Sequence, residues 1–294
     1  MSVRAHLPAA DPRPMVPALF VLLWSTGFVF ARLGLDDAEP FTFLALRFAI
    51  VTVLIGAIAL AMRAPWPRSL GETGHFAVIG LLMHGCYLGG TYAAMAAGVP
   101  AGIAALIVGL QPLLTASVVG PLLGERVRPV QWAGLFLGFA GVALVLWEKL
   151  VLDRVPWWAA AWAALALVAI TGATLYQKRF CPTMDWRSGG FIQYAAATAM
   201  IGAAALAFEK NTVAWTAGLL FALGWLVIVL SMGAIALLNW MIRRGAAARV
   251  ASLFYLVPPV AALESWLIFG ERLGPAALIG MAATVFGVAL VMRP

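Results

Sequence analysis

Ten runs of apolar residues, each close to the length of a membrane-spanning helix, dominate this chain of 294 residues. A helix needs about 20 apolar residues to cross the hydrocarbon core of a bilayer. The runs do not alternate polar and apolar residues, as the strands of a transmembrane barrel would. The sequence therefore predicts an all-α membrane protein with ten transmembrane helices, at residues 16–31, 41–62, 76–97, 102–122, 130–147, 157–177, 189–208, 217–238, 246–269 and 275–291.

The overall composition excludes a soluble domain. Hydrophobic residues make up 64% of the chain and charged residues only 11%, whereas soluble domains average about 45–50% and about 25%. The net charge of +7 comes from Lys and Arg in short loops between the apolar runs. This is the pattern of membrane topology rather than of nucleic-acid binding.

A second feature is an internal repeat, in which residues 112–146 align without a gap on residues 258–292. Each copy contains an apolar helix with an internal proline, a G-E-R turn and a second apolar helix. The chain is therefore one unit made twice, and we predict a short tail at residues 1–14 followed by repeats at 15–150 and 151–294. The identical positions are Pro112/Pro258, Ala116/Ala262, Gly124/Gly270, Glu125/Glu271, Arg126/Arg272, Pro129/Pro275, Gly134/Gly280 and 141–145/287–291.

The Lys and Arg residues predict the orientation of the helices. Of the 19 basic residues, 13 lie at one set of helix ends, including both termini, and 5 lie at the other set beside Asp36, Asp37 and Glu39. By the positive-inside rule, both termini and the tail are cytoplasmic. Because five helices per repeat is an odd number, the second repeat must be inverted relative to the first. Inverted repeats around a central cavity are typical of secondary transporters.

Three motifs resemble the drug/metabolite transporter superfamily, specifically its ten-helix EamA-type exporters. They are the run L-W-S-T-G-F at 23–28, the run P-F-T-F-L-A-L-R-F at 40–48, and the repeated unit from proline to G-E-R. The resemblance implies two five-helix halves around a central cavity and outward transport of small metabolites. It also implies a multi-pass protein of the bacterial inner membrane.

Within that superfamily, the L-W-S-T run and the many aromatic residues resemble YddG-type exporters of aromatic amino acids and cationic drugs. The two halves of the chain differ at some matching positions, since Gln193 stands where the first half has Arg47. If the first-half residues are functional, the halves contribute unequally to the site.

Two charged residues fall inside the apolar runs at similar depth, Arg47 and Glu264. A charge inside the membrane should face the interior of the bundle and find a partner. We therefore consider an Arg47–Glu264 pair at an external gate, or Glu264 as a proton or cation site. The alternative is a structural pair with no part in transport.

Polar and aromatic residues inside the runs are the candidate substrate-binding residues. His84 and Tyr87 lie one turn apart near the middle of the third run, and a histidine there either changes charge near neutral pH or is a neutral structural residue. Trp24 could stack on a planar substrate or anchor a helix at the interface. The full candidate set is Trp24, Thr26, His84, Tyr87, Gln111, Gln193 and Tyr255.

The prolines Pro112, Pro258 and Pro259 lie in the middle of the fourth and ninth runs. An internal proline removes a backbone hydrogen bond and kinks a helix, so these residues are candidate hinges or the cause of simple curvature. Gly134, Gly138 and Gly141 form a G-x-x-x-G face that suits close helix packing. We expect packing within the chain, and hence a monomer, in preference to a homodimer.

The sequence does not indicate an enzyme. It has no phosphate-binding Walker loop, no cluster with metal-ligand spacing and no sign of a cofactor. We predict a secondary transporter that exports small metabolites, aromatic or neutral amino acids above all, by alternating access. The alternatives are a multidrug exporter of lipophilic cations, a channel and a membrane-embedded enzyme.

Overall fold

The computed structural model describes residues 15–99, 101–147, 157–245, 247–269 and 274–293. They form ten helical spans long and apolar enough to cross a membrane, as predicted. Six spans are single helices: α1 (Met15–Leu35), α2 (Pro40–Ala61), α7 (Pro129–Leu146), α8 (Trp157–Phe180), α9 (Trp186–Phe208) and α14 (Pro275–Met292). The tail, the junction at 150/151 and the second G-E-R turn lie outside the described residues.

The other four spans are each built from shorter segments. The third is α3 (Leu70–Gly80), η1 (Leu81–Cys86) and α4 (Tyr87–Ala96), and the fourth is α5 (Ala101–Val108) and α6 (Gln111–Leu123). The eighth is α10 (Ala217–Trp225), η3 (Leu226–Ala234) and α11 (Ile235–Arg244). The ninth is α12 (Ala247–Ser252), η4 (Leu253–Leu256) and α13 (Val257–Phe269).

These interruptions of helical geometry occur at matching positions of the two repeats. The segments η1 and η3 are both π-helical, and adding 146 to 81–86 gives 227–232, which lies inside η3. The break between α5 and α6 at residues 109–110 likewise matches 255–256, inside the 3-10 turn η4. The repeat therefore extends to the backbone geometry of both halves.

The prolines proposed as kinks lie inside their spans, next to these changes of helical geometry. Pro112 is in the first turn of α6, and Pro258 and Pro259 are in the first turn of α13. For Pro112, which follows the break at 109–110, the missing N–H is one that a first turn leaves without a partner. Pro258 and Pro259 follow η4 without a gap, so they lie inside a continuous helical stretch where its geometry changes from 3-10 to α. Their role as hinges stays a prediction.

The last helices of the two repeats, α7 and α14, pack along each other through glycines. A Cβ on Gly134 would lie 2.6 Å from the carbonyl oxygen of Gly287, and one on Gly141 would lie 2.6 Å from that of Gly280. Since Gly134 matches Gly280 and Gly141 matches Gly287, these contacts are reciprocal, as two-fold symmetry requires. The helices run antiparallel, so the repeats are inverted, and the predicted glycine face packs within the chain.

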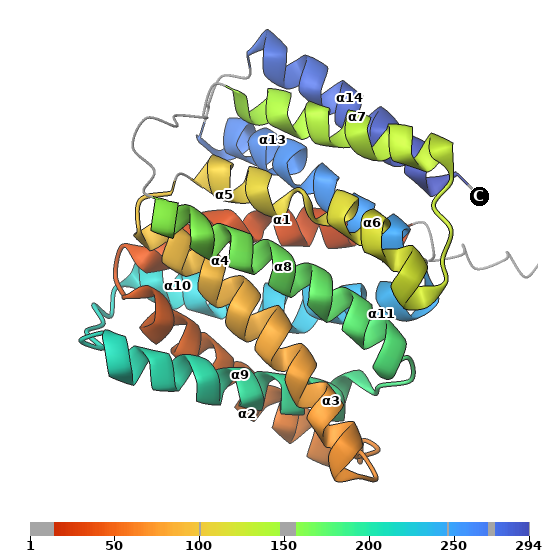
Figure 1. Ribbon diagram of the computed structural model, residues 1–294. Coiled ribbons are helices and arrows are strands. Elements are labelled where there is room, and N and C mark those ends of the chain that lie inside the picture. Colours follow the sequence, from red (N-terminus) through yellow and green to blue (C-terminus); the bar gives the residue numbers. More distant parts are fainter. Residues whose placement is uncertain (1–14, 100, 148–156, 246, 270–273, 294) are drawn as a thin grey trace, which may run out of the picture.

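The second helices of the repeats, α2 and α9, form the corresponding pair at the opposite edge of the bundle (Figure 1). Here Thr52 and Thr198, which differ by 146 positions, place their hydroxyl oxygens 3.3 Å apart. Equivalent residues of two repeats can touch only where the pseudo-two-fold axis passes between them. The axis therefore runs through both pairs, with the remaining helices between them.

Loops gather at two opposite faces of the bundle. At the first, here the Asp36 face, Glu209 accepts hydrogen bonds from the backbone N–H groups of Phe41 and Thr42 at the start of α2 (2.8 and 2.7 Å). At the other, here the Glu125 face, Arg179 donates to the carbonyl of Leu122 (2.8 Å). Among the described residues, the basic loops meet at this face, since Arg187 donates to the carbonyl of Met62, Arg128 to that of Arg293 and Arg243 to that of Met184. Which face is cytoplasmic stays a prediction.

We expect Gly141→Ala to lower the melting temperature of the purified protein in detergent. The added methyl group must displace α14, and overpacking of this kind costs about 1–3 kcal/mol. Gly202→Ala in α9 is the matched control, because nothing lies within 4 Å of a Cβ placed there. An equal loss in both variants would contradict the glycine-mediated packing of α7 on α14.

Candidate functional site

A cavity lies between the first repeat and the eighth span, near the middle of the bundle. Its wall comes from α1, α2, α4, η3 and α11. Of the residues singled out from the sequence, Trp24, Tyr87 and Arg47 line it. The full lining is Trp24, Gly27, Ala31, Arg47, Tyr87, Leu88, Thr91, Tyr92, Met95, Leu226, Leu230 and Ile235.

Arg47 brings a buried positive charge to this cavity, with only 4% of the residue exposed. Its Nε donates to the hydroxyl of Ser231 on η3 (3.0 Å), and its Nη1 donates to the hydroxyl of Tyr92 on α4 (3.4 Å). Both partners are neutral, and no ion pair of Arg47 is present among the described residues. Insertion measurements put the cost of an arginine at the bilayer centre at about 2.5–3.5 kcal/mol. An anion that enters the cavity would offset this cost, because it would form charge-assisted hydrogen bonds with the guanidinium.

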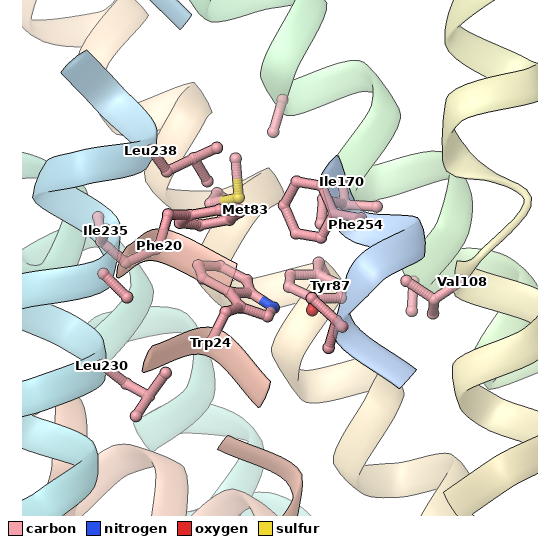
Figure 2. Packing of buried hydrophobic residues seen from close by; sticks show 14 of the residues in the cluster. Phe20, Trp24, Met83, Tyr87, Val108, Ile170, Leu230, Ile235, Leu238 and Phe254 are labelled. Atoms are coloured by element: carbon pink, nitrogen blue, oxygen red, sulfur yellow. The ribbon is translucent and has the colours of Figure 1, made fainter. Parts of the chain in front are cut away.

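The rest of the wall is aromatic and apolar. Trp24 packs against Phe20 and Phe254, with ring centroids 5.1 and 5.2 Å away. Figure 2 shows Trp24 and Tyr87 next to each other, with Leu230 and Ile235 on the neighbouring span. Aromatic pairs at these distances prefer tilted and edge-to-face arrangements, which fix the ring positions. The cavity thus combines one cationic group with a rigid apolar wall.

The predicted pairing of Arg47 with Glu264 is not formed. The Ser25 hydroxyl donates to Oε1 of Glu264 at 2.7 Å, across the contact between α1 and α13. Oε2 of Glu264 is buried and has no partner among the described residues. The two residues were matched by depth along their helices, but depth does not fix the direction in which a side chain points. Whether either residue acts at a gate or carries a proton stays a prediction.

His84 lies in the bundle but is not in the wall of the cavity. Its ring stacks on that of Tyr194, with centroids 4.1 Å apart and planes inclined by 15°. Neither ring nitrogen has a hydrogen-bond partner among the described residues. His84 thus packs between helices without the hydrogen bond expected of a structural histidine, and its role in substrate binding stays a prediction.

Four other candidates also lie away from the cavity wall. Thr26 accepts a hydrogen bond from the indole of Trp225 (2.9 Å), which ties α1 to α10. Gln193 donates to the sulfur of Met184 (3.3 Å), and Gln111 donates to Thr174 (3.5 Å). Tyr255 is fully buried, and its ring occupies the space beside Gly138. A role for them in substrate binding remains a prediction for another conformation.

Several lining residues were not singled out as binding candidates. Leu88, Thr91, Tyr92 and Met95 share one face of α4, and their i, i+3, i+4, i+7 spacing could have indicated a common surface. Ser231 carries no such signal, because an isolated serine in an apolar run is common in membrane helices. Its importance depends on Arg47, which comes from another repeat.

A larger hollow opens at the Asp36 face beyond the cavity. Met95 lines both spaces, so the cavity adjoins the hollow on this side. The hollow has an acidic rim formed by Asp36, Asp37 and Glu39, with Arg32 on its wall.

We expect Ser231→Ala to lower the melting temperature, because it leaves the buried Nε of Arg47 without an acceptor. An unsatisfied buried charged donor costs more than about 1–3 kcal/mol. Ser252→Ala is the matched control, since Ser252 is also fully buried but bonds only to Arg249 of its own helix. Identical melting curves for Ser231→Ala and the parent would contradict the described Arg47 contact.

The chain is similar to transporters over nearly its whole length. It is 28% identical to the uncharacterized inner membrane transporter YedA of Escherichia coli (strain K12), across 95% of this chain and 90% of that protein. It is 29% identical to a probable terminal-alkyne amino-acid exporter of Streptantibioticus cattleyicolor, across 94% of this chain and 91% of that protein.

Two further similarities are informative. A probable amino-acid metabolite efflux pump of Escherichia coli (strain K12) is 30% identical across 45% of this chain and 42% of that protein. A solved crystal structure superposes with a TM-score of 0.80 at 25% identity and covers 95% of each chain. The profile of the EamA-like transporter family matches residues 15–147 and 157–293. The chain therefore belongs to the EamA-like transporter family, a family of secondary transporters and not of enzymes, and carries two copies of its domain.

Proposed function

We propose that this protein exports amino acids with neutral or aromatic side chains by alternating access. The observation that carries the proposal is the guanidinium of Arg47, which lines the cavity with only neutral hydroxyl partners among the described residues. An α-carboxylate matches the planar fork of an arginine and supplies the missing negative charge. Two relatives are named as amino-acid exporters or efflux pumps, which supports the same substrate class.

The wall around Arg47 favours substrates with an apolar side chain. Trp24, Tyr87 and Leu230 offer contact surface to a neutral or aromatic group. Pockets of this kind obtain orientation from a few polar groups and affinity from the apolar lining. A carboxylate held at Arg47 would direct the rest of the amino acid toward these residues.

The second candidate is a multidrug exporter of lipophilic cations. It would need a carboxylate in the cavity, and Glu264 was the intramembrane acid that suggested it. Glu264 instead bonds Ser25 and is not in the cavity wall, whereas Arg47 is. Like charges repel, so this arrangement favours anions and zwitterions over cations.

We further propose that the protein resides in the bacterial inner membrane with both termini in the cytoplasm. The basic loops of the Glu125 face support this orientation through the positive-inside rule. The relative YedA is named as an inner membrane transporter. Export would then run from the Glu125 face to the Asp36 face.

The first test compares three related solutes in proteoliposomes: phenylalanine, phenethylamine without the carboxylate, and phenylpropionate without the amine. We expect saturable flux of phenylalanine, no flux of phenethylamine, and competition by phenylpropionate. Arg47→Lys should reduce kcat/KM for phenylalanine by about thirtyfold or more, because a point charge replaces a bidentate donor and desolvated charge contacts are worth about 2–5 kcal/mol. Arg126→Lys is the control, since Arg126 is exposed at the Glu125 face.

Transport of phenethylamine without transport of any amino acid would refute the substrate class and support the cation alternative. Flux that does not saturate would indicate a channel. Neither result would alter the assignment to the family.

A second test addresses the side-chain preference. We expect Trp24→Ala to raise KM for phenylalanine several-fold more than KM for alanine, because the lost indole surface contacts only a large substrate side chain. Competition assays with the two amino acids measure both effects on the same protein. An equal change for both substrates would mean that Trp24 acts only through packing with Phe20 and Phe254.

A further inference from the structure

The bundle is closed where the path from the cavity would reach the Glu125 face. On that side, Gln177 of α8 donates to Asn239 of α11 (3.1 Å), and both side chains are buried. Met241, also in α11, is only 4% exposed. The hydrogen bond between Gln177 and Asn239 thus joins α8 to α11 on the Glu125 side of the cavity.

Next to this contact, Glu125 of the first G-E-R turn connects three elements. Its Oε1 lies 2.6 Å from Nζ of Lys178, at the end of α8. Its Oε2 accepts a hydrogen bond from the backbone N–H of Ala247, at the start of α12 (3.0 Å). Lys178 also donates to the carbonyl oxygen of Gly245. Glu125, Lys178, Gly245 and Ala247 are therefore joined at the Glu125 face.

The internal repeat relates this closed region to the open one at the Asp36 face. Subtracting 146 converts Gln177 into Ala31, Lys178 into Arg32, Met241 into Met95 and Gly245 into Val99. All four counterparts line the cavity or the hollow at the Asp36 face. Residues at matching positions of the two repeats therefore lie in packed contacts at the Glu125 face and along a cavity and a hollow at the Asp36 face.

Polar atoms without partners lie close to the closed region. Among the described residues, Oε1 of Gln111, Oγ1 of Thr115 and Oε1 of Gln177 are buried and make no hydrogen bond. Each of these residues is fully buried. The hydrogen bond from Gln111 to Thr174 places them between α6 and α8. Buried polar groups normally have partners, and an aqueous passage in another conformation would supply them.

We propose that Glu125 is the gate residue that holds this passage shut, and that breaking its contacts exposes the region between α8 and α11 to the Glu125 face. The inference rests on the proposed transport function, since it describes how access to the Arg47 cavity changes sides. Bonds from a cationic amine and from a helix N-terminus to one carboxylate are charge-assisted and directional. Releasing this one carboxylate therefore removes the contacts of the G-E-R turn with α8 and with α12 together. The passage itself would run beside Gln111 and Gln177.

The test measures thiol accessibility at two positions related by the repeat, Met95→Cys and Met241→Cys. Each is made separately in protein that also carries Cys86→Ala and Cys181→Ala, so that one thiol is present. A charged maleimide that does not cross membranes labels the purified protein without substrate. In the parent, we expect fast labelling at position 95 and slow labelling at position 241.

Adding Glu125→Gln should raise the labelling rate at position 241 about tenfold, equivalent to a shift of about 1.4 kcal/mol, and lower it at position 95. Lys178→Met removes the other member of the ion pair. It should likewise raise the labelling rate at position 241 and lower it at position 95. Arg126→Gln, at the exposed neighbour of Glu125, should change neither rate.

An unchanged rate at position 241 in both gate variants would overturn the proposal. So would equal increases at both positions, since these indicate general loosening rather than a change of side. Because no substrate is present, the outcome is independent of whether amino acids are the cargo. A failure of the amino-acid assignment and a failure of the gate can therefore be told apart.

Discussion

In lipid, every backbone polar group must find its hydrogen-bond partner inside the protein, and this constraint sets the form of the whole bundle. All ten described spans are helical for that reason. Departures from α-helical geometry occur at η1, η3 and η4, whose members include the buried residues His84, Ser231 and Tyr255. Irregular backbone is thus found within the bundle, next to the cavity or to the closed region beside it.

The two repeats share their backbone but differ in chemistry. Arg47 of the first repeat places a cation in the cavity wall, whereas its counterpart Gln193 turns toward Met184. Near Glu125, Lys178 and its counterpart Arg32 are both basic, whereas Gln177 corresponds to Ala31. The cavity is therefore asymmetric, although the two repeats share one backbone arrangement.

Glycine packing separates the fixed edges of the bundle from its interior. The α7–α14 pair is held by Gly134, Gly141 and their counterparts, with backbones in direct contact. Such contacts leave little room for relative movement. The segments α5, α6, α10, α11 and α13 of the interrupted spans lie between this pair and the α2–α9 pair, and α3 packs beside α9 (Figure 1). This arrangement suits movement of the inner helices against two stable edges.

Much of the fold could be predicted because its signals can be read directly along the sequence. Run length predicts helices, and the 146-residue repeat with an odd helix number predicts inversion. The interruptions at 109–110 and in η1 and η3 were not predicted, because a π-helical turn changes hydrogen bonding without a distinctive composition. The prolines were recognised, but their position in the first turn of α6 and α13 depends on those unpredicted breaks.

By itself, the sequence determined that the chain is a ten-helix membrane protein of two inverted halves, with Arg47 as a charge that must face the interior. The tertiary structure decided which partners that charge has, and it replaced Glu264 by Ser231 and Tyr92. It also decided that Trp24 and Tyr87 line the cavity while His84 and Gln193 do not. The physical reason is that hydrophobicity and length fix the depth of a residue in the bilayer, whereas its neighbours depend on helix rotation, which only packing between spans sets.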